Sequence, residues 1–207
     1  MRWVRSSSLS LAFGAIFIAA LVGQALTGHA EFNHEAIAHG GDPISLGRYV
    51  TSSSFAVDVM ENWQSEYLQF ALYIFATVWF IQRGSTESKK PGEEGPGSDT
   101  TRRRYSWWYE NSLVLVMMAI FLLSWAAMAV TGRVDYNAQQ LDHQEAALTL
   151  WQYVGSSDFW NRTLQNWQSE FLAVGSMAAL SIYLRQRGSS ESKPVGAPDE
   201  QTGTETG

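Results

Sequence analysis

The chain has 207 residues, of which 45% are hydrophobic and 16% are charged, and its formal net charge at pH 7 is −6. It contains no cysteine, which excludes disulfides, thiolate metal sites, iron–sulfur clusters and covalently attached c-type haem. No basic patch is interleaved with aromatic residues, so we expect no nucleic-acid partner. The apolar residues gather in long runs separated by charged segments, the pattern of a small all-α integral membrane protein.

The first predicted element is an apolar run at residues 9–27, behind a short basic N-terminus. A cleaved signal peptide has the same basic start and apolar centre, and small residues near Ala30 resemble a cleavage site. A shift of 104 residues, however, places Ser8-Leu9 on Ser112-Leu113. Because an internal copy cannot be a cleaved leader, we interpret residues 9–27 as a retained transmembrane helix. Cleavage of residues 1–30 is the alternative.

The following polar residues, 28–61, predict an exterior loop. His29, His34 and His39 lie in this loop together with several acidic residues. Their spacing of five does not place them on one helical face, and the second copy keeps only His143 opposite His39. We therefore expect ordinary loop histidines and no metal site.

Two helix starts follow in each copy. Ser45 and Thr149 precede apolar residues at helical spacing, which predicts a short helix at the membrane surface. A second cap at Ser54, matched by Asp158, predicts a helix that runs on to Ile81. A helix of that length measures about 42 Å and exceeds the ~30 Å hydrocarbon core, so its first turns should lie outside the bilayer.

A repeated motif organises the chain. Asn-Trp-Gln-Ser-Glu-Tyr-Leu at 62–68 returns as Asn-Trp-Gln-Ser-Glu-Phe-Leu at 166–172. Each copy runs into an apolar stretch that ends in a closing signature, Gln-Arg-Gly-Ser-x-Glu-Ser-Lys, at 82–89 and 186–193. The chain is therefore predicted to be a tandem duplication. The closing signature is typical of a helix end with a glycine stop and a charged boundary, and a cytoplasmic binding or modification site is the alternative.

The segments after each copy are rich in Gly, Pro, Ser and charge, with nothing apolar to bury, which predicts disorder. Repeat 1 is predicted at 1–90, with spans at about 9–27 and 64–82 and an exterior loop at 28–61. Repeat 2 is predicted at 105–193, with spans at about 112–131 and 168–185 and an exterior loop at 132–165. A disordered cytoplasmic linker is predicted at 84–104, and a disordered cytoplasmic tail at 188–207.

The basic residues predict the orientation. Of the 14 Lys and Arg residues, 11 lie in the termini, the linker and the adjacent span ends, and only Arg48, Arg133 and Arg162 lie in the exterior loops. The majority face should be cytoplasmic, which places both termini inside a bacterial cytoplasmic (inner) membrane. Because each repeat has an even number of spans, the repeats should enter the membrane in the same direction, as two parallel helical hairpins.

The candidate site residues are the polar and aromatic positions of the motif, which are Asn62, Trp63, Glu66, Asn166, Trp167 and Glu170. The tryptophans fit the interfacial aromatic belt. An acidic side chain at membrane depth is costly and usually faces a bundle interior or an aqueous cavity, where it relays protons or binds a cation. Alternatively, Glu66 reaches the exterior headgroup region and acts as a solvated anchor.

The chain resembles an uncharacterised bacterial domain-of-unknown-function family of small four-span membrane proteins with two tandem repeats. The resemblance rests on the Ser-Leu apolar run, the Ser-Leu-x-x-Tyr segment at Ser45, the motif and the closing signature. It covers nearly the whole chain outside the linker and tail. It implies the four-span fold and brings no activity with it.

Several enzymatic and redox functions lack their residues. No histidine falls inside a predicted span, which argues against b-type haem, and Ser65 and Ser169 have no histidine at a helical spacing. We therefore predict no cofactor and no catalytic residue. An enzyme built from the exterior acids with His39 or His143 ranks last.

We expect a non-enzymatic structural or accessory membrane protein. Its partners would be the lipid bilayer and either a second copy or another membrane protein. The alternative is a small transporter or channel that uses Glu66 and Glu170 as a paired proton or cation site.

Overall fold

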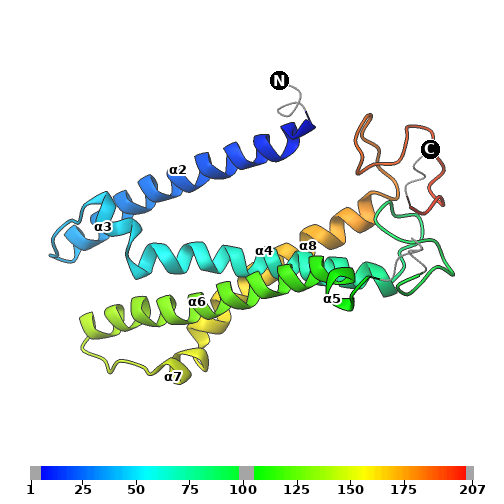
Figure 1. Ribbon diagram of the computed structural model, residues 1–207. Coiled ribbons are helices and arrows are strands. Elements are labelled where there is room, and N and C mark those ends of the chain that lie inside the picture. The colour runs from blue at the N-terminus through cyan, green and yellow to red at the C-terminus, as the bar shows by residue number, and fades with distance from the viewer. Residues whose placement is uncertain (1–5, 98–104, 204–207) are drawn as a thin grey trace. The chain divides into compact units, whose positions relative to one another are not determined.

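The computed structural model describes residues 6–97 and 105–203. In this part of the chain helices are joined by turns and no strand occurs, so the all-helical prediction is confirmed (Figure 1). The elements are α2 (Ser8–Ala38), α3 (Leu46–Val50), α4 (Ser53–Trp79), α5 (Trp107–Glu110), α6 (Ser112–Asp142), α7 (Leu150–Val154) and α8 (Ser157–Leu180). The basic N-terminus, residues 98–104 of the predicted linker and the last four residues of the tail lie outside the described residues.

Two helices, α2 and α6, are long and apolar enough to cross a membrane. None of the apolar window of α2 and only 22% of that of α6 is buried. A signal sequence, or the core helix of a soluble protein, passes the same test of length and composition. These two helices agree with the first and third predicted spans.

The helices continue beyond the ends predicted for those spans. The spans were placed at residues 9–27 and 112–131, whereas both helices have 31 residues and reach Ala38 and Asp142. Polar residues end an apolar run, but they do not break a helix. Helix α2 ends only where Gly40 adopts a positive φ of 78°.

The second and fourth predicted spans do not pass this test. Helix α4 ends at Trp79 and α8 at Leu180, short of the predicted ends at 82 and 185. The uninterrupted apolar part of α4 begins only at Phe70, after the polar side chains of the motif. From Phe70 to Trp79 the helix covers about 15 Å, half of the hydrocarbon core. The expectation of four self-sufficient apolar spans is therefore corrected to two within the described residues.

The predicted short helices are confirmed as α3 and α7. The Ser45 side chain accepts a hydrogen bond from the backbone of Arg48, and Thr149 forms a capping box with Gln152. Each short helix carries one buried tyrosine, and both rings are almost inaccessible, at 3% for Tyr49 and 0% for Tyr153. Burial of that ring fixes each short helix to its neighbours.

Contacts divide the chain into two compact units, Met1–Val59 with Val130–Ala147 and Met60–Ala129 with Leu148–Gly207. In the first unit α3 lies beside the C-terminal half of α2 (Figure 1). The Tyr49 ring lies 5.6 Å from Phe32 and 5.5 Å from Phe55 between ring centroids. A Cβ at Gly28 would lie 2.3 Å from the Tyr49 hydroxyl, so glycine permits this close approach.

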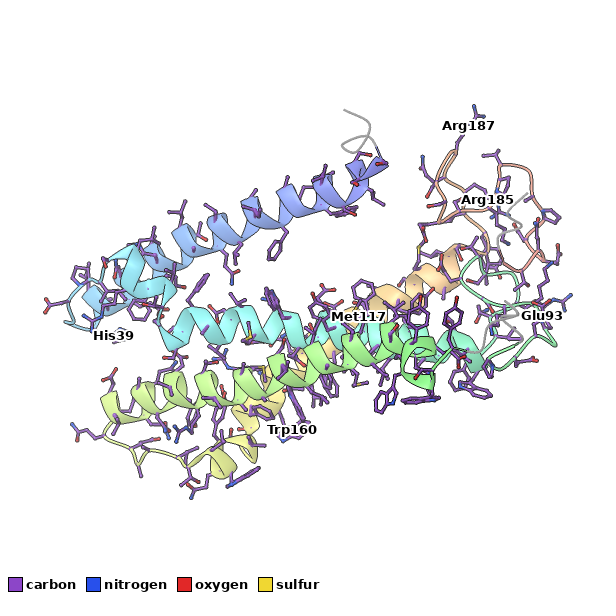
Figure 2. All side chains as sticks on the ribbon, viewed as in Figure 1. His39, Glu93, Met117, Trp160, Arg185 and Arg187 are labelled. Atoms are coloured by element: carbon purple, nitrogen blue, oxygen red, sulfur yellow. The ribbon has the colours of Figure 1, made fainter. Side chains whose placement is uncertain are left out.

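In the second unit the Tyr153 ring packs edge-on against Phe159, with 5.8 Å between centroids, and its hydroxyl donates to Asp158 at 2.9 Å. Farther along α8, Thr163 is fully buried and accepts a hydrogen bond of 3.2 Å from Trp125 of α6. Trp160, which projects from α8 in Figure 2, lies 6.1 Å from Trp125 between ring centroids. These aromatic contacts join α6, α7 and α8.

We predict that Tyr153→Ala destabilises the purified protein by about 3–5 kcal/mol, because a fully buried aromatic ring leaves a cavity. Tyr153→Phe should lose only about 1 kcal/mol, since it removes one hydrogen bond and keeps the ring. Thermal unfolding followed by circular dichroism measures both. Equal losses in the two variants would contradict the packing role of the ring.

Candidate functional site

Both copies of the motif lie on long helices of the second unit. Asn62, Trp63 and Glu66 are exposed positions of α4, whereas Asn166, Trp167 and Glu170 are half-buried positions of α8. The motif residues of the two helices are joined by hydrogen bonds in which one copy contacts the other. The six candidate residues therefore belong to one region of the molecule.

A carboxylate that the sequence analysis did not single out, Glu61, is the centre of this region. Arg162 Nη1 donates to Glu61 Oε2 at 3.0 Å, and Asn166 Nδ2 donates to Glu61 Oε1 at 2.8 Å. Arg162 Nε also donates to Asp158 at 3.2 Å. The side chains of Glu61 and Arg162 are only 14% and 28% exposed, so water screens this ion pair poorly. We call Glu61, Arg162 and Asn166 the clamp.

The neighbouring acidic side chains stabilise the protonated, positively charged form of Arg162. Burial lowers the pKa of Arg162, but the hydrogen bond to Glu61 and the negative charges of Asp158 and Glu61 outweigh it. The pKa of the guanidinium is therefore raised overall, and the clamp keeps its positive member at any physiological pH.

A second contact lies one turn farther along α4. The indole nitrogen of Trp167 donates to Gln64 Oε1 at 2.8 Å, and Gln64 is fully buried. The amide nitrogen of Gln64 has no hydrogen-bond partner. Trp167 was expected in the interfacial belt, and its role in this unit is to satisfy a buried amide. The Gln64–Trp167 contact and the clamp together hold α4 against α8.

The carboxyl group of Glu66 is near enough to that of Glu170 to interact with it electrostatically. Two ionised carboxylates that are close together repel each other, and a proton or a cation between them relieves this repulsion. The structure thus brings together the two acidic residues that the sequence analysis paired. Glu66 remains exposed, so a solvated anchor is still the other interpretation.

The closing signatures form the same loop twice. The backbone nitrogen of Gln82 donates to Ser88 Oγ at 2.9 Å, and that of Gln186 donates to Ser192 Oγ at 2.8 Å. The glycine that follows, Gly84 or Gly188, has a positive φ of 84° or 82°. Helices α4 and α8 end earlier, at Trp79 and Leu180, so the prediction that these glycines stop the helices is wrong, and each glycine lies in the loop that follows.

The lysine of each signature closes its loop on a backbone carbonyl six residues ahead. Lys89 Nζ donates to Gly95, and Lys193 Nζ donates to Asp199 at 2.8 Å. Burial and the neighbouring Arg185 charge lower the pKa of Lys193. Residues 84–97 and 188–203 contain turns and no helix, and the disorder expected for the linker and tail stays a prediction.

The histidines that were predicted to lie in a loop belong to α2 or its end, because α2 includes His29 and His34 and His39 is its C-cap. Two of them have local partners. A ring nitrogen of His29 lies 2.6 Å from the carbonyl oxygen of Ile44, and His39, at the end of α2 in Figure 2, lies 2.9 Å from the carbonyl of Glu35. Within residues 6–97 and 105–203, no group of three or more His, Cys, Asp or Glu side chains is placed to hold a metal ion.

Sequence reasoning missed Glu61 and Arg162 because it compared equivalent positions of the two copies. The 104-residue shift places Asp58 on Arg162 and Glu61 on Gln165. The sequence feature that could have revealed the pair is this change of charge. One turn before the motif, the second copy has an arginine where the first copy has an acid. Opposite charges at such positions can pair across the two helices.

Comparison with known proteins places the chain in a family. No curated protein and no solved structure matches it. The family model described as "Domain of unknown function (DUF6766)" matches residues 1–204. The expected resemblance to a family of unknown function is confirmed at that level, and the family description names neither repeats nor spans. Because the match covers nearly the whole chain, this protein belongs to the DUF6766 family.

Proposed function

We propose that this protein is a non-enzymatic, multi-pass membrane protein with a structural or accessory role, in which the duplicated motif joins α4 to α8. The observation that carries the proposal is the set of hydrogen bonds that the motif and the residues just before it form between α4 and α8. They use an ion pair, an amide and an indole, and no nucleophile is paired with a base. Such groups order helices and perform no covalent chemistry.

The apolar surfaces of α2 and α6 support a bilayer as the environment. Leu9 and Phe13 of α2 are 71% and 64% exposed, and Leu123 of α6 is 71% exposed. Contiguous apolar surface of this extent is rare on soluble monomers. Lipid chains would cover it, and each helix is long enough for the ~30 Å core.

Four spans remain our proposal, although α4 and α8 are less apolar. A polar side chain is tolerated in a membrane helix when a neighbouring helix satisfies it. The bond from Trp167 satisfies the amide oxygen of Gln64 on α4 in this way. With the basic residues inside, both termini would be cytoplasmic and the membrane would be the inner membrane of a bacterium. A second copy or another membrane protein would meet the exposed faces of α2 and α6.

We predict that the motif bonds stabilise the protein. Trp167→Phe leaves the buried Gln64 amide without any partner and should cost about 1–3 kcal/mol, and Asn166→Ala should cost about 1 kcal/mol. Thermal unfolding in lipid nanodiscs measures the loss, and native mass spectrometry shows whether a companion chain is lost with it.

Two exposed residues provide matched controls for these variants. Gln165→Ala, next to Asn166, and Trp151→Phe, at a tryptophan that is 81% exposed, should stay within about 0.5 kcal/mol of the wild type. If the motif variants are no less stable than these controls and keep the same assembly, the structural role is wrong.

The absence of cysteine permits a direct test of the four spans. Single cysteines introduced as Asp42→Cys and Glu145→Cys should react with an impermeant thiol reagent added to intact cells. Cysteines introduced as Glu93→Cys and Glu200→Cys should react only after permeabilisation. A chain that crosses only through α2 and α6 would expose position 93 on the same side as position 42, so labelling of Glu93→Cys in intact cells rejects the four-span topology.

A second candidate function is a small transporter or channel for protons or common cations. It is favoured by one observation, the close approach of Glu66 and Glu170. Two neighbouring negative carboxylates favour the binding of a proton or a cation, which relieves their repulsion. In a membrane, acidic pairs of this kind serve as relay or transport sites.

We predict for this candidate that Glu66→Gln combined with Glu170→Gln abolishes a flux across liposomes and leaves the helical content unchanged. A pH-sensitive dye reports protons, and ion-sensitive dyes report sodium and potassium. Glu31→Gln with Glu35→Gln removes the same charge elsewhere and should not alter the flux. Wild-type liposomes without any flux would reject the transporter.

A further inference from the structure

A cavity of about 230 Å³ lies between α4 and α8, at the ends where the closing-signature loops begin. Its apolar wall is formed by Phe70 of α4 and by Val174 and Met177 of α8. Each of these residues lies about one or two turns beyond the Glu66–Glu170 pair on its own helix. The cavity is smaller than the pockets that hold drug-sized ligands.

Two carboxylates stand at the loop side of this cavity, one from each closing signature. Glu87 and Glu191 occupy equivalent positions of the signature, and both line the cavity. Glu87 accepts a hydrogen bond of 2.8 Å from the Tyr73 hydroxyl, and Glu191 accepts one of 2.9 Å from Ser190. Each carboxylate has four lone-pair positions, so both can accept further donors.

The position of these carboxylates is fixed by their loops. The backbone nitrogen of Glu87 donates to Ser85 Oγ at 3.2 Å, and that of Glu191 donates to Ser189 Oγ at 3.1 Å. Together with the serine and lysine bonds of each loop, these contacts present both side chains to the same cavity.

A third acceptor comes from the helix side. Gln69 lines the cavity, and its amide oxygen is buried with no hydrogen-bond partner. A buried acceptor without a donor is unfavourable, so it marks a place where a donor is missing. The equivalent residue of the second copy is Ala173, which also lines the cavity and leaves room there.

We propose that this cavity binds a small organic ammonium ion, with its charged group between Glu87, Glu191 and Gln69 and its alkyl chain against Phe70, Val174 and Met177. An ammonium group has three donors, which equals the number of acceptor side chains, and two carboxylates supply the opposite charge. The apolar wall offers no ligands to a hydrated inorganic cation, which takes six or more oxygen atoms. The described residues also contain no group of three metal-binding side chains.

This binding site is separate from the proposed roles of the motif and does not depend on transport. A soluble amine and an aminolipid headgroup carry the same ammonium chemistry. The test therefore has to distinguish these two sources.

Isothermal titration of the full chain in phosphatidylglycerol nanodiscs with n-butylammonium chloride tests the proposal. We expect saturable binding of one ion per chain. Neutral n-butanol should bind at least about tenfold more weakly, because it lacks the charge that the carboxylates require. Sodium, magnesium and calcium chloride, each at equal ionic strength, should not displace butylammonium. Displacement by one of these ions, or no saturable binding at all, overturns the proposal.

Variants locate the binding in the cavity. Glu87→Gln with Glu191→Gln should weaken butylammonium binding at least about tenfold. Glu93→Gln with Glu94→Gln removes the same charge outside the cavity, from the loop where Figure 2 labels Glu93, and should leave the affinity unchanged. Equal loss in both double variants would show general charge attraction and overturn the site.

A variant without a charge change guards against misfolding of the glutamine variants. Val174→Phe fills the cavity and keeps both carboxylates, so it should also weaken binding at least about tenfold with unchanged helical content. Undiminished binding in Val174→Phe would overturn the site. Addition of phosphatidylethanolamine to the nanodiscs identifies the source, because competition assigns the site to a lipid headgroup and its absence assigns the site to a soluble amine.

Discussion

The second unit depends on the contact in which Arg162 and Asn166 of α8 hold the two carboxylate oxygens of Glu61, just before the motif on α4. A partly buried ion pair adds little net stability, because desolvation offsets much of the attraction. Its effect on specificity is larger. A shift of α8 along α4 by one turn, about 5.4 Å, would leave Glu61 buried without its partners. The clamp therefore fixes the register of the two helices.

That register decides which side chains meet farther along. Residues three, four and seven positions apart share a helix face, so the face of α4 that carries Glu66 also carries Gln69 and Tyr73. On α8 the face of Glu170 carries Val174 and Met177 in the same way. With the clamp at one end, the paired glutamates, the cavity and the closing-signature loops follow in order. The register set by the clamp thus determines where the paired glutamates, the cavity and the closing-signature loops lie along the two helices.

Local features of the fold could be predicted from the sequence, and pairings between distant residues could not. The caps Ser45 and Thr149 act within a few residues, and they form as expected. The ends of the first and third spans were misplaced because polar residues end an apolar run without ending the helix, and α2 continues to Ala38, two residues before Gly40. The bond between Trp167 and Gln64 joins residues 103 positions apart, and no local pattern specifies it.

The two copies carry different charges at one of the positions that matter here and the same negative charge at two others. Before the motif, Arg162 stands where the first copy has Asp58, and opposite charges meet in the clamp. At Glu66 with Glu170, and at Glu87 with Glu191, both copies keep an acid. A pair of like charges on facing elements is unfavourable unless something positive neutralises it. An arginine within the chain does so at the first position. At the other two positions a proton or a bound cation would neutralise the pair, which is why we propose function there.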